Sequence, residues 1–126
     1  LWDKWTFLAT LAGINTLMRA NVGEILATEF GARVTEKMFK ECCSVAQKSQ
    51  YLISEETQAQ SLSILQKPDS DFTASMLRDL DSGYRTEHEH IIGSMLRRGN
   101  ALNLYCPSLQ LAYTQLVIRD NQRLKS

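Results

Sequence analysis

The segment Trp2–Ala20 limits what this chain can fold into, because its apolar residues do not keep to one side of a helix. Residues 5–18 carry no charge, and the tryptophans and aliphatic residues fall on several faces at helical spacing. A helix that is apolar most of the way round lies at the centre of a protein. These fourteen uncharged residues are fewer than the ~20 that span a bilayer, so the segment predicts a buried central helix. Gly13 within it indicates a close crossing with another helix.

Helix-start patterns divide the rest of the chain. Asn21 and Glu24 form a capping box, and the two glutamates after Ser54 complement the dipole of another helix. Thr28 is predicted to cap the helix between these two, and Pro107 fits the first turn of the last helix. The predicted helices cover residues 2–20, 22–27, 28 to about 48, 54 to the loop at 67–71, 73–82, 86 to about 98 (ended by Gly99-Asn100), and 107 to a fraying tail from Arg119. No stretch alternates at period two for long, so residues 1–126 predict one all-α domain, a multi-helix bundle.

Composition narrows the classes of partner and compartment. Fourteen basic and fourteen acidic residues cancel, which argues against a nucleic-acid partner or an anionic membrane surface. The three cysteines include an adjacent pair, Cys42-Cys43, and an odd count does not suggest a disulfide framework. A reducing, cytoplasmic setting is therefore expected.

Residues 73–93 bring two predicted helix ends together. Gly83 ends the first helix, and Thr86 opens the second as the cap of a capping box. Ser75 lies in the first helix, and Glu87 is the first helical residue of the second. Because the N–H groups of a helix start favour anions, this corner is a candidate binding site.

Several pieces of this corner, taken together, resemble a known family. They are Ser-Met-Leu-Arg-Asp-Leu at 75–80, Gly83, Arg-Thr-Glu at 85–87 and Ile-Gly at 92–93. The spacing is similar to that of the C-terminal helical domain of ketopantoate reductases (2-dehydropantoate 2-reductases), and the resemblance extends over 2–116. It implies a helical domain like that of 6-phosphogluconate dehydrogenase-like enzymes. It also implies NADPH-dependent reduction of 2-dehydropantoate, or a related 2-keto acid, in pantothenate biosynthesis.

The resemblance assigns roles to three residues. Taken alone, Lys4 is a solvated surface lysine, Glu87 a carboxylate that complements a helix dipole, and Ser75 a surface serine. The family places a catalytic lysine in a Trp-x-Lys context, which Trp2-Asp3-Lys4 matches. The match implies that Lys4 stabilises the developing oxyanion and supplies a proton. It implies that Glu87 binds the substrate hydroxyl and holds the lysine, and that Ser75 binds the substrate carboxylate.

The sequence departs from the family one and two turns after Lys4. Characterised members carry side-chain amides there, whereas this chain has Leu8 and Ala12. Asn15 is displaced from these two positions by most of a helical turn, so the role of the family's amides is not carried over to it. The exact substrate is therefore left open between ketopantoate and a related 2-keto acid.

The sequence contains no Gly-x-Gly-x-x-Gly turn, which a dinucleotide-binding domain requires. The resemblance places that NADPH-binding Rossmann domain upstream of Leu1, so the isolated chain is expected to be inactive. The alternative is a helical interaction or dimerisation module without catalysis, and a homodimer is compatible with both interpretations.

The His88-Glu89-His90 motif does not predict a metal site. Residues two apart on a helix point about 200° apart, so the two histidines cannot easily share one ion. Cys42 falls on an apolar stripe and is predicted to be a core residue.

Overall fold

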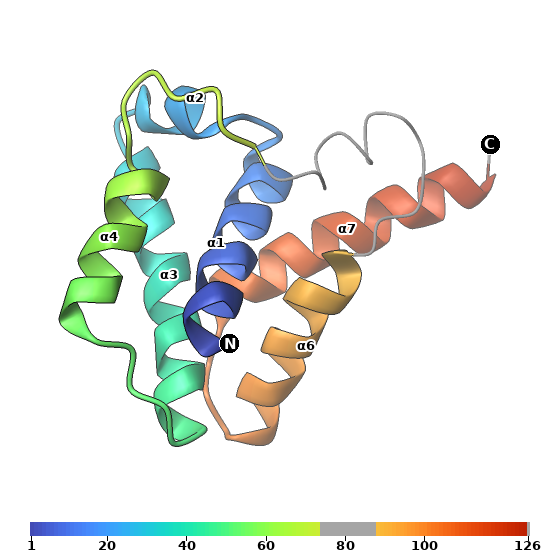
Figure 1. The fold of residues 1–126 in the computed structure, drawn as a ribbon. Helices are drawn as coiled ribbons and strands as arrows, with labels where there is room; N and C mark the ends of the chain where they lie inside the picture. Colours follow the sequence, from blue (N-terminus) through green and yellow to red (C-terminus); the bar gives the residue numbers. More distant parts are fainter. Residues whose placement is uncertain (74–87, 126) are drawn as a thin grey trace.

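The computed structural model describes residues 1–73 and 88–125, which form helices and no strand within those ranges (Figure 1). The helices are α1 (Trp2–Met18), α2 (Val22–Leu26), α3 (Gly31–Lys48), α4 (Glu55–Leu65), α6 (His88–Ala101) and α7 (Pro107–Lys125). This confirms the predicted all-α bundle. None of the described helices is both long enough and apolar enough to span a membrane.

Helix α1 is central, as its sequence predicts. It runs between α3 on one side and α6 and α7 on the other, and it packs against all three (Figure 1). Residues 9–16 of α1 are buried without interruption. Burial on every side explains why the apolar residues of this helix do not keep to one stripe.

Two glycines allow helices to meet closely. A Cβ atom on Gly13 would overlap the sulfur of Met38 on α3, so this glycine marks the crossing of α1 and α3. A Cβ atom on Gly31 would overlap the carbonyl oxygen of Ile25, so this glycine lets α3 begin directly against α2. The close crossing expected at Gly13 is therefore present.

The core lies where α1, α3 and α7 face one another. Its fully buried side chains on α3 and α7 recur at helical spacing: Met38, Phe39, Cys42, Val45, Leu109, Ala112 and Leu116. Burying each larger apolar side chain contributes roughly 1.5–3 kcal/mol. The prediction that Cys42 is a core residue is confirmed.

Capping at Asn21 and Ser54 follows the sequence prediction. The Asn21 side chain accepts a hydrogen bond from the Glu24 N–H at 2.8 Å, and the Glu24 carboxylate accepts one from the Asn21 N–H at 2.8 Å. Ser54 Oγ accepts from the Thr57 N–H at 3.1 Å. The loop after α4 also accepts a hydrogen bond from α2, because the Gly23 N–H donates to the Ser70 carbonyl at 2.7 Å.

Three predicted helix boundaries are wrong. Thr28 does not cap α3, because its hydroxyl donates back to the Ile25 carbonyl and Phe30 holds the cap position. Gly99-Asn100 does not end α6, which continues to Ala101; a Cβ atom on Gly99 would meet the sulfur of Cys106 at 2.9 Å, so this glycine permits close packing. The polar tail from Arg119 is helical as far as Lys125.

Candidate functional site

Lys4 lies in the first turn of α1 and is exposed. It forms no hydrogen bond or ion pair with the residues that the structure describes. The rings of its sequence neighbours Trp2 and Trp5 stack with their centroids 4.7 Å apart. The ammonium is therefore carried by a packed helix and is not engaged by the part of the chain that the structure describes.

Two contacts set α1 and α6 antiparallel. The Trp5 indole N–H donates to the Ile91 carbonyl at 3.2 Å, in the first turn of α6. The Arg98 guanidinium lies 5.4 Å from the centroid of the Trp2 ring, further along α6. The start of α6 therefore lies beside the turn of α1 that carries Lys4.

Ser75 and Glu87, the other two predicted site residues, lie outside the described residues, as do Gly83 and Thr86. The described chain resumes at His88, directly after Glu87. The convergence of Lys4, Ser75 and Glu87 stays a prediction.

The face of α1 that follows Lys4 is apolar. Leu8 is partly exposed, and Ala12 is 1% exposed. Asn15 is completely buried, and its amide donates to the Ala20 carbonyl at 2.9 Å just past the end of the helix. Asn15 therefore bonds the segment after α1 back to the helix.

Helices α6 and α7 are joined by a polar contact on the surface. The Arg97 guanidinium donates to the Tyr113 hydroxyl at 2.9 Å, and that hydroxyl lies 3.5 Å from the Glu89 carboxylate.

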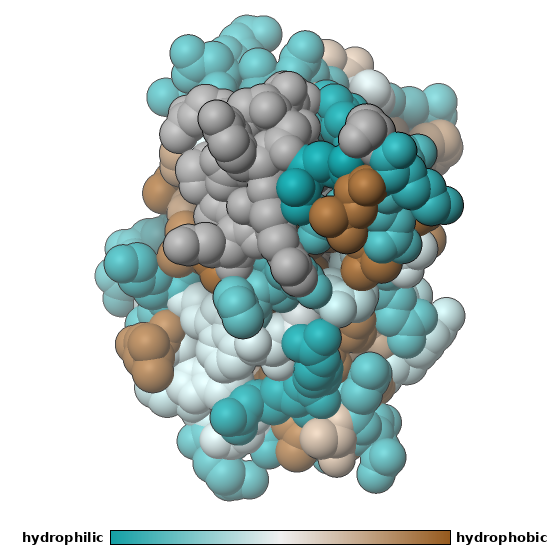
Figure 2. Space-filling model, turned by 90° about the vertical axis from the view of Figure 1, so that its right-hand side faces the viewer, coloured by the Kyte–Doolittle hydropathy of each residue, from teal (hydrophilic) through white to brown (hydrophobic). Residues whose placement is uncertain are grey.

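A groove of about 510 Å³ lies between α6 and α1. It is lined by Trp5, Ser94, Arg97, Arg98, Ala101 and Leu102. On the side of the molecule toward which the C-terminal end of α7 points, hydrophobic surface is broken up by hydrophilic side chains (Figure 2).

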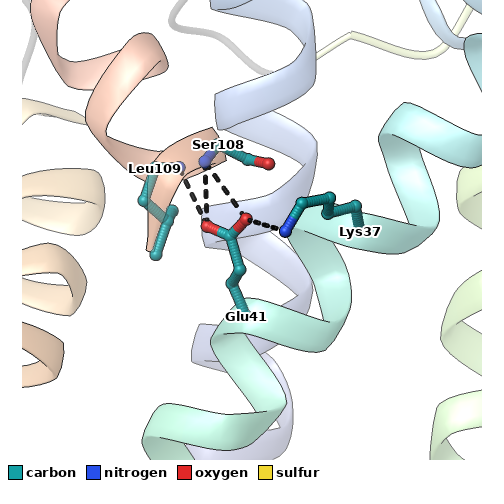
Figure 3. Close-up of polar contacts among 4 residues, drawn as sticks. All are labelled: Lys37, Glu41, Ser108 and Leu109. Atoms are coloured by element: carbon teal, nitrogen blue, oxygen red, sulfur yellow. Dashed lines mark hydrogen bonds and ion pairs between the residues drawn. The ribbon is translucent and has the colours of Figure 1, made fainter. Parts of the chain in front are cut away.

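Sequence reasoning missed a buried carboxylate, Glu41 on α3. Its two oxygens accept hydrogen bonds from the Ser108 and Leu109 N–H groups at the start of α7, each at 3.1 Å (Figure 3). Lys37 Nζ lies 3.3 Å from Glu41 Oε2. Glu41 therefore caps α7 from another helix. One signal in the sequence could have indicated a cap from elsewhere in the chain. Cys106 precedes α7, at a position where a capping side chain is usual.

The three cysteines, Cys42, Cys43 and Cys106, are free thiols, and burial raises the pKa of each. Burial raises the pKa of the Cys42 thiol far above its usual range. Burial also raises the pKa of Cys43 to about 11, with Lys40 opposing the shift. Among the described residues, no group of three His, Cys, Asp or Glu side chains could hold a metal ion.

The described glycines do not form a phosphate-binding turn. Gly13, Gly93 and Gly99 lie inside helices, where close packing with other helices accounts for them. The described residues therefore do not fit the phosphates of a dinucleotide cofactor, which need a glycine-rich turn between a strand and a helix.

Comparison with known proteins gives a consistent result. A family model described as "Ketopantoate reductase PanE/ApbA C terminal" matches residues 1–119. An uncharacterised oxidoreductase of Bacillus subtilis, YkpB, is 30% identical over 123 residues, which are 98% of this chain and 41% of the relative. This chain thus spans about two fifths of that relative's length.

Solved structures share the fold. A ketopantoate reductase from Ralstonia eutropha superposes with a TM-score of 0.86 at 20% identity, over 98% of this chain and 41% of that one. A dimeric ketopantoate reductase from Staphylococcus aureus gives 0.84 at 25% identity, over 97% and 43%. D-Mandelate dehydrogenase, solved with NADH and anilino(oxo)acetate, gives 0.81 at 20% identity, over 98% and 52%.

Proposed function

This chain belongs to the ketopantoate reductase PanE/ApbA family as its C-terminal domain, and from that premise we propose that it forms the substrate side of an NADPH-dependent reductase. The reaction proposed is reduction of a 2-oxo acid, 2-dehydropantoate or a related compound, to the 2-hydroxy acid. With 2-dehydropantoate the product is pantoate, on the route to pantothenate.

The observation that carries this proposal is the position of Lys4. The side chain is exposed on a packed helix and is not engaged by the described residues. Reduction adds a hydride to the carbonyl carbon and a proton to its oxygen. An ammonium beside that oxygen stabilises the negative charge that develops and donates the proton.

Glu87 and Ser75 are proposed to complete the site. The Trp5–Ile91 hydrogen bond supports the role of Glu87, because Ile91 lies four residues after Glu87 in the sequence. In this proposal, the Glu87 carboxylate binds the substrate hydroxyl and orients Lys4. The Ser75 hydroxyl binds the substrate carboxylate.

NADPH is proposed to supply the hydride, bound mainly by a part of the longer protein outside this chain. The absence of a phosphate-binding turn among the described residues is consistent with that division. We propose a cytoplasmic homodimer, for which the dimeric Staphylococcus aureus reductase is the precedent.

The test uses the longer protein that contains this chain. NADPH oxidation is followed with a panel of 2-oxo acids that includes 2-dehydropantoate, and residues 1–126 alone serve as the control. The whole protein should reduce at least one of the acids, and the isolated chain none. A folded whole protein that reduces none of them would contradict the proposal and favour a non-catalytic interaction module.

A further inference from the structure

We infer that Trp5 is a positioning residue for Lys4, because its indole N–H ties the first turn of α1 to α6 and so fixes the place of the Lys4 ammonium. The inference rests on the function proposed above, in which that ammonium meets the substrate oxygen. Trp5 acts in it through Lys4, the residue that precedes it in the sequence.

The first turn of α1, which carries Lys4, has no side-chain cap. Leu1 occupies the cap position, and its side chain makes no hydrogen bond to the helix. Because the first N–H groups of a helix have no partner within it, an uncapped first turn opens easily. The position of Lys4 therefore depends on the contacts that this turn makes with the rest of the molecule.

Trp5 makes a directional contact between this turn and α6. Its indole N–H donates at 3.2 Å to the carbonyl of Ile91, which is 86 positions away in the sequence. The hydroxyls of Thr6 and Thr10, by contrast, donate to carbonyls of their own helix. Apolar packing between helices is non-directional, whereas a hydrogen bond requires a defined distance and angle. The Trp5 bond therefore fixes the rotation and the register of this turn relative to α6.

The Trp5 ring is itself held in place. It stacks on Trp2 with the two centroids 4.7 Å apart, and the Arg98 guanidinium lies 5.4 Å from the centroid of the Trp2 ring. Arg98 and Ile91 belong to different turns of α6, so the pair of tryptophans contacts that helix at two levels. A ring packed in this way keeps its N–H directed at the Ile91 carbonyl.

Lys4 moves with Trp5, because the two are consecutive residues of one helix. Successive side chains lie about 100° apart around the helix axis, so the Lys4 side chain leaves α1 in a different direction from the Trp5 side chain. Side-chain ends lie ~6 Å from the axis, so a rotation of this turn by about 10° moves them by ~1 Å. A misplacement of about 1 Å can lower the rate of a reaction by about a hundredfold.

The test replaces Trp5 in the longer protein that we propose contains this chain. Trp5→Phe keeps a flat apolar ring and removes the N–H. It should lower kcat for a 2-oxo acid that the parent protein reduces by about tenfold to a hundredfold. The matched control is Trp2→Phe, because the contacts of Trp2 are those of its ring face. It should leave kcat close to that of the parent.

Equal kcat values for Trp5→Phe and the parent, or an equal loss in Trp2→Phe, would overturn the inference while the proposed reductase function stands. A parent protein that reduces none of the acids would overturn both.

A double-mutant cycle with Lys4→Met separates positioning from a general loss of structure. If Trp5 acts through Lys4, Trp5→Phe should lower kcat in the parent and cause no further loss once Lys4 has been replaced. The slow reaction of the Lys4→Met protein is followed with the enzyme in excess over the substrate. A loss by the same factor in both backgrounds would show that Trp5 does not act through Lys4, and it would overturn the inference.

Hydrogen exchange in the same proteins gives a readout that does not depend on activity. The backbone N–H of Trp5 donates to the Leu1 carbonyl at 3.0 Å and closes the first turn of α1. This amide should exchange about two- to tenfold faster in Trp5→Phe than in the parent, and no faster in Trp2→Phe. Unchanged exchange in Trp5→Phe would show that the bond to Ile91 does not hold this turn.

Discussion

Two charged side chains on neighbouring helices, Glu41 of α3 and Lys4 of α1, are used in opposite ways. Glu41 is 7% exposed, and its oxygens accept hydrogen bonds from two backbone N–H groups and from Lys37. Lys4 is exposed and forms no such bond with the described residues. A buried charge with satisfied oxygens stabilises the arrangement of helices. An exposed charge on a packed helix remains able to bind a ligand. The contrast is between a carboxylate that fixes the fold and an ammonium that is proposed to perform chemistry.

The largest expected effect comes from Lys4→Met in the longer protein that we propose contains this chain. Loss of the proposed proton donor and oxyanion stabiliser should lower kcat by about 10²- to 10⁴-fold. Because Lys4 is exposed, the free energy of unfolding should change by less than about 0.5 kcal/mol. Steady-state kinetics and urea denaturation measure the two quantities.

Lys40→Met is the matched control for Lys4→Met, because Lys40 is an exposed lysine on α3. It should leave both kcat and stability close to those of the parent protein. A Lys4→Met variant that keeps its kcat would show that the exposed ammonium has no catalytic role. Lys4 would then differ from Glu41 in burial and bonding but not in function.

Glu41→Ala should produce the largest loss of stability. It leaves the Ser108 and Leu109 N–H groups buried without an acceptor, at a cost of about 2–4 kcal/mol. Glu41→Gln keeps one acceptor and should lose less. Urea denaturation of the isolated chain measures the difference, with the exposed Glu36→Ala on the same helix as the control. If Glu41→Ala matched that control, packing alone would hold the start of α7.

Gly13→Ala tests the packing of α1 against α3, the helices that carry Lys4 and Glu41. The added Cβ atom would overlap the sulfur of the fully buried Met38, and overpacking costs about 1–3 kcal/mol. The better helix propensity of alanine offsets about 1 kcal/mol, so a net loss of up to about 2 kcal/mol is expected. Thermal and urea denaturation measure it. Shortening the neighbour with Met38→Val should make the two effects non-additive, whereas additive effects would show that the helices do not meet here as described.

Local signals predicted much of the fold. The capping box at Asn21 and Glu24, the cap at Ser54 and the helix start at Pro107 each depend on residues within one turn, and all three are present. The central position of α1 followed from its lack of a polar face. Such features depend on short-range geometry, which a sequence displays directly.

Long-range contacts explain the misses. Glu41 binds backbone groups 67 and 68 positions away, and nothing in its own segment indicates that partner. Gly99 was predicted to end a helix, but it faces Cys106 and Val45, whose approach is a matter of tertiary packing. For the candidate site, the sequence located Lys4 on the first turn of the central helix. The roles of Ser75 and Glu87 come from resemblance alone, because these residues lie outside the described ranges.

The smallest expected effect concerns Cys43, which lies on α3 and is influenced by the charges of Lys40 and of Asp3 on α1. Burial raises its pKa from 9.0 to about 11, so between these values the folded state keeps a proton that the unfolded state releases. The stability linked to this thiol is therefore full below about pH 9 and falls as the pH rises toward about 11. Because the thiol is only partly buried, screening should keep the effect below about 1 kcal/mol. Urea denaturation at about pH 8 and about pH 10.5 compares the parent protein with Cys43→Ala, in which Cys42 and Cys106 still titrate. The parent should lose more stability than the variant between the two pH values. Equal losses would mean that Cys43 is solvated in the folded protein, and that α1 and α3 pack less tightly near Lys4 than they do at Gly13.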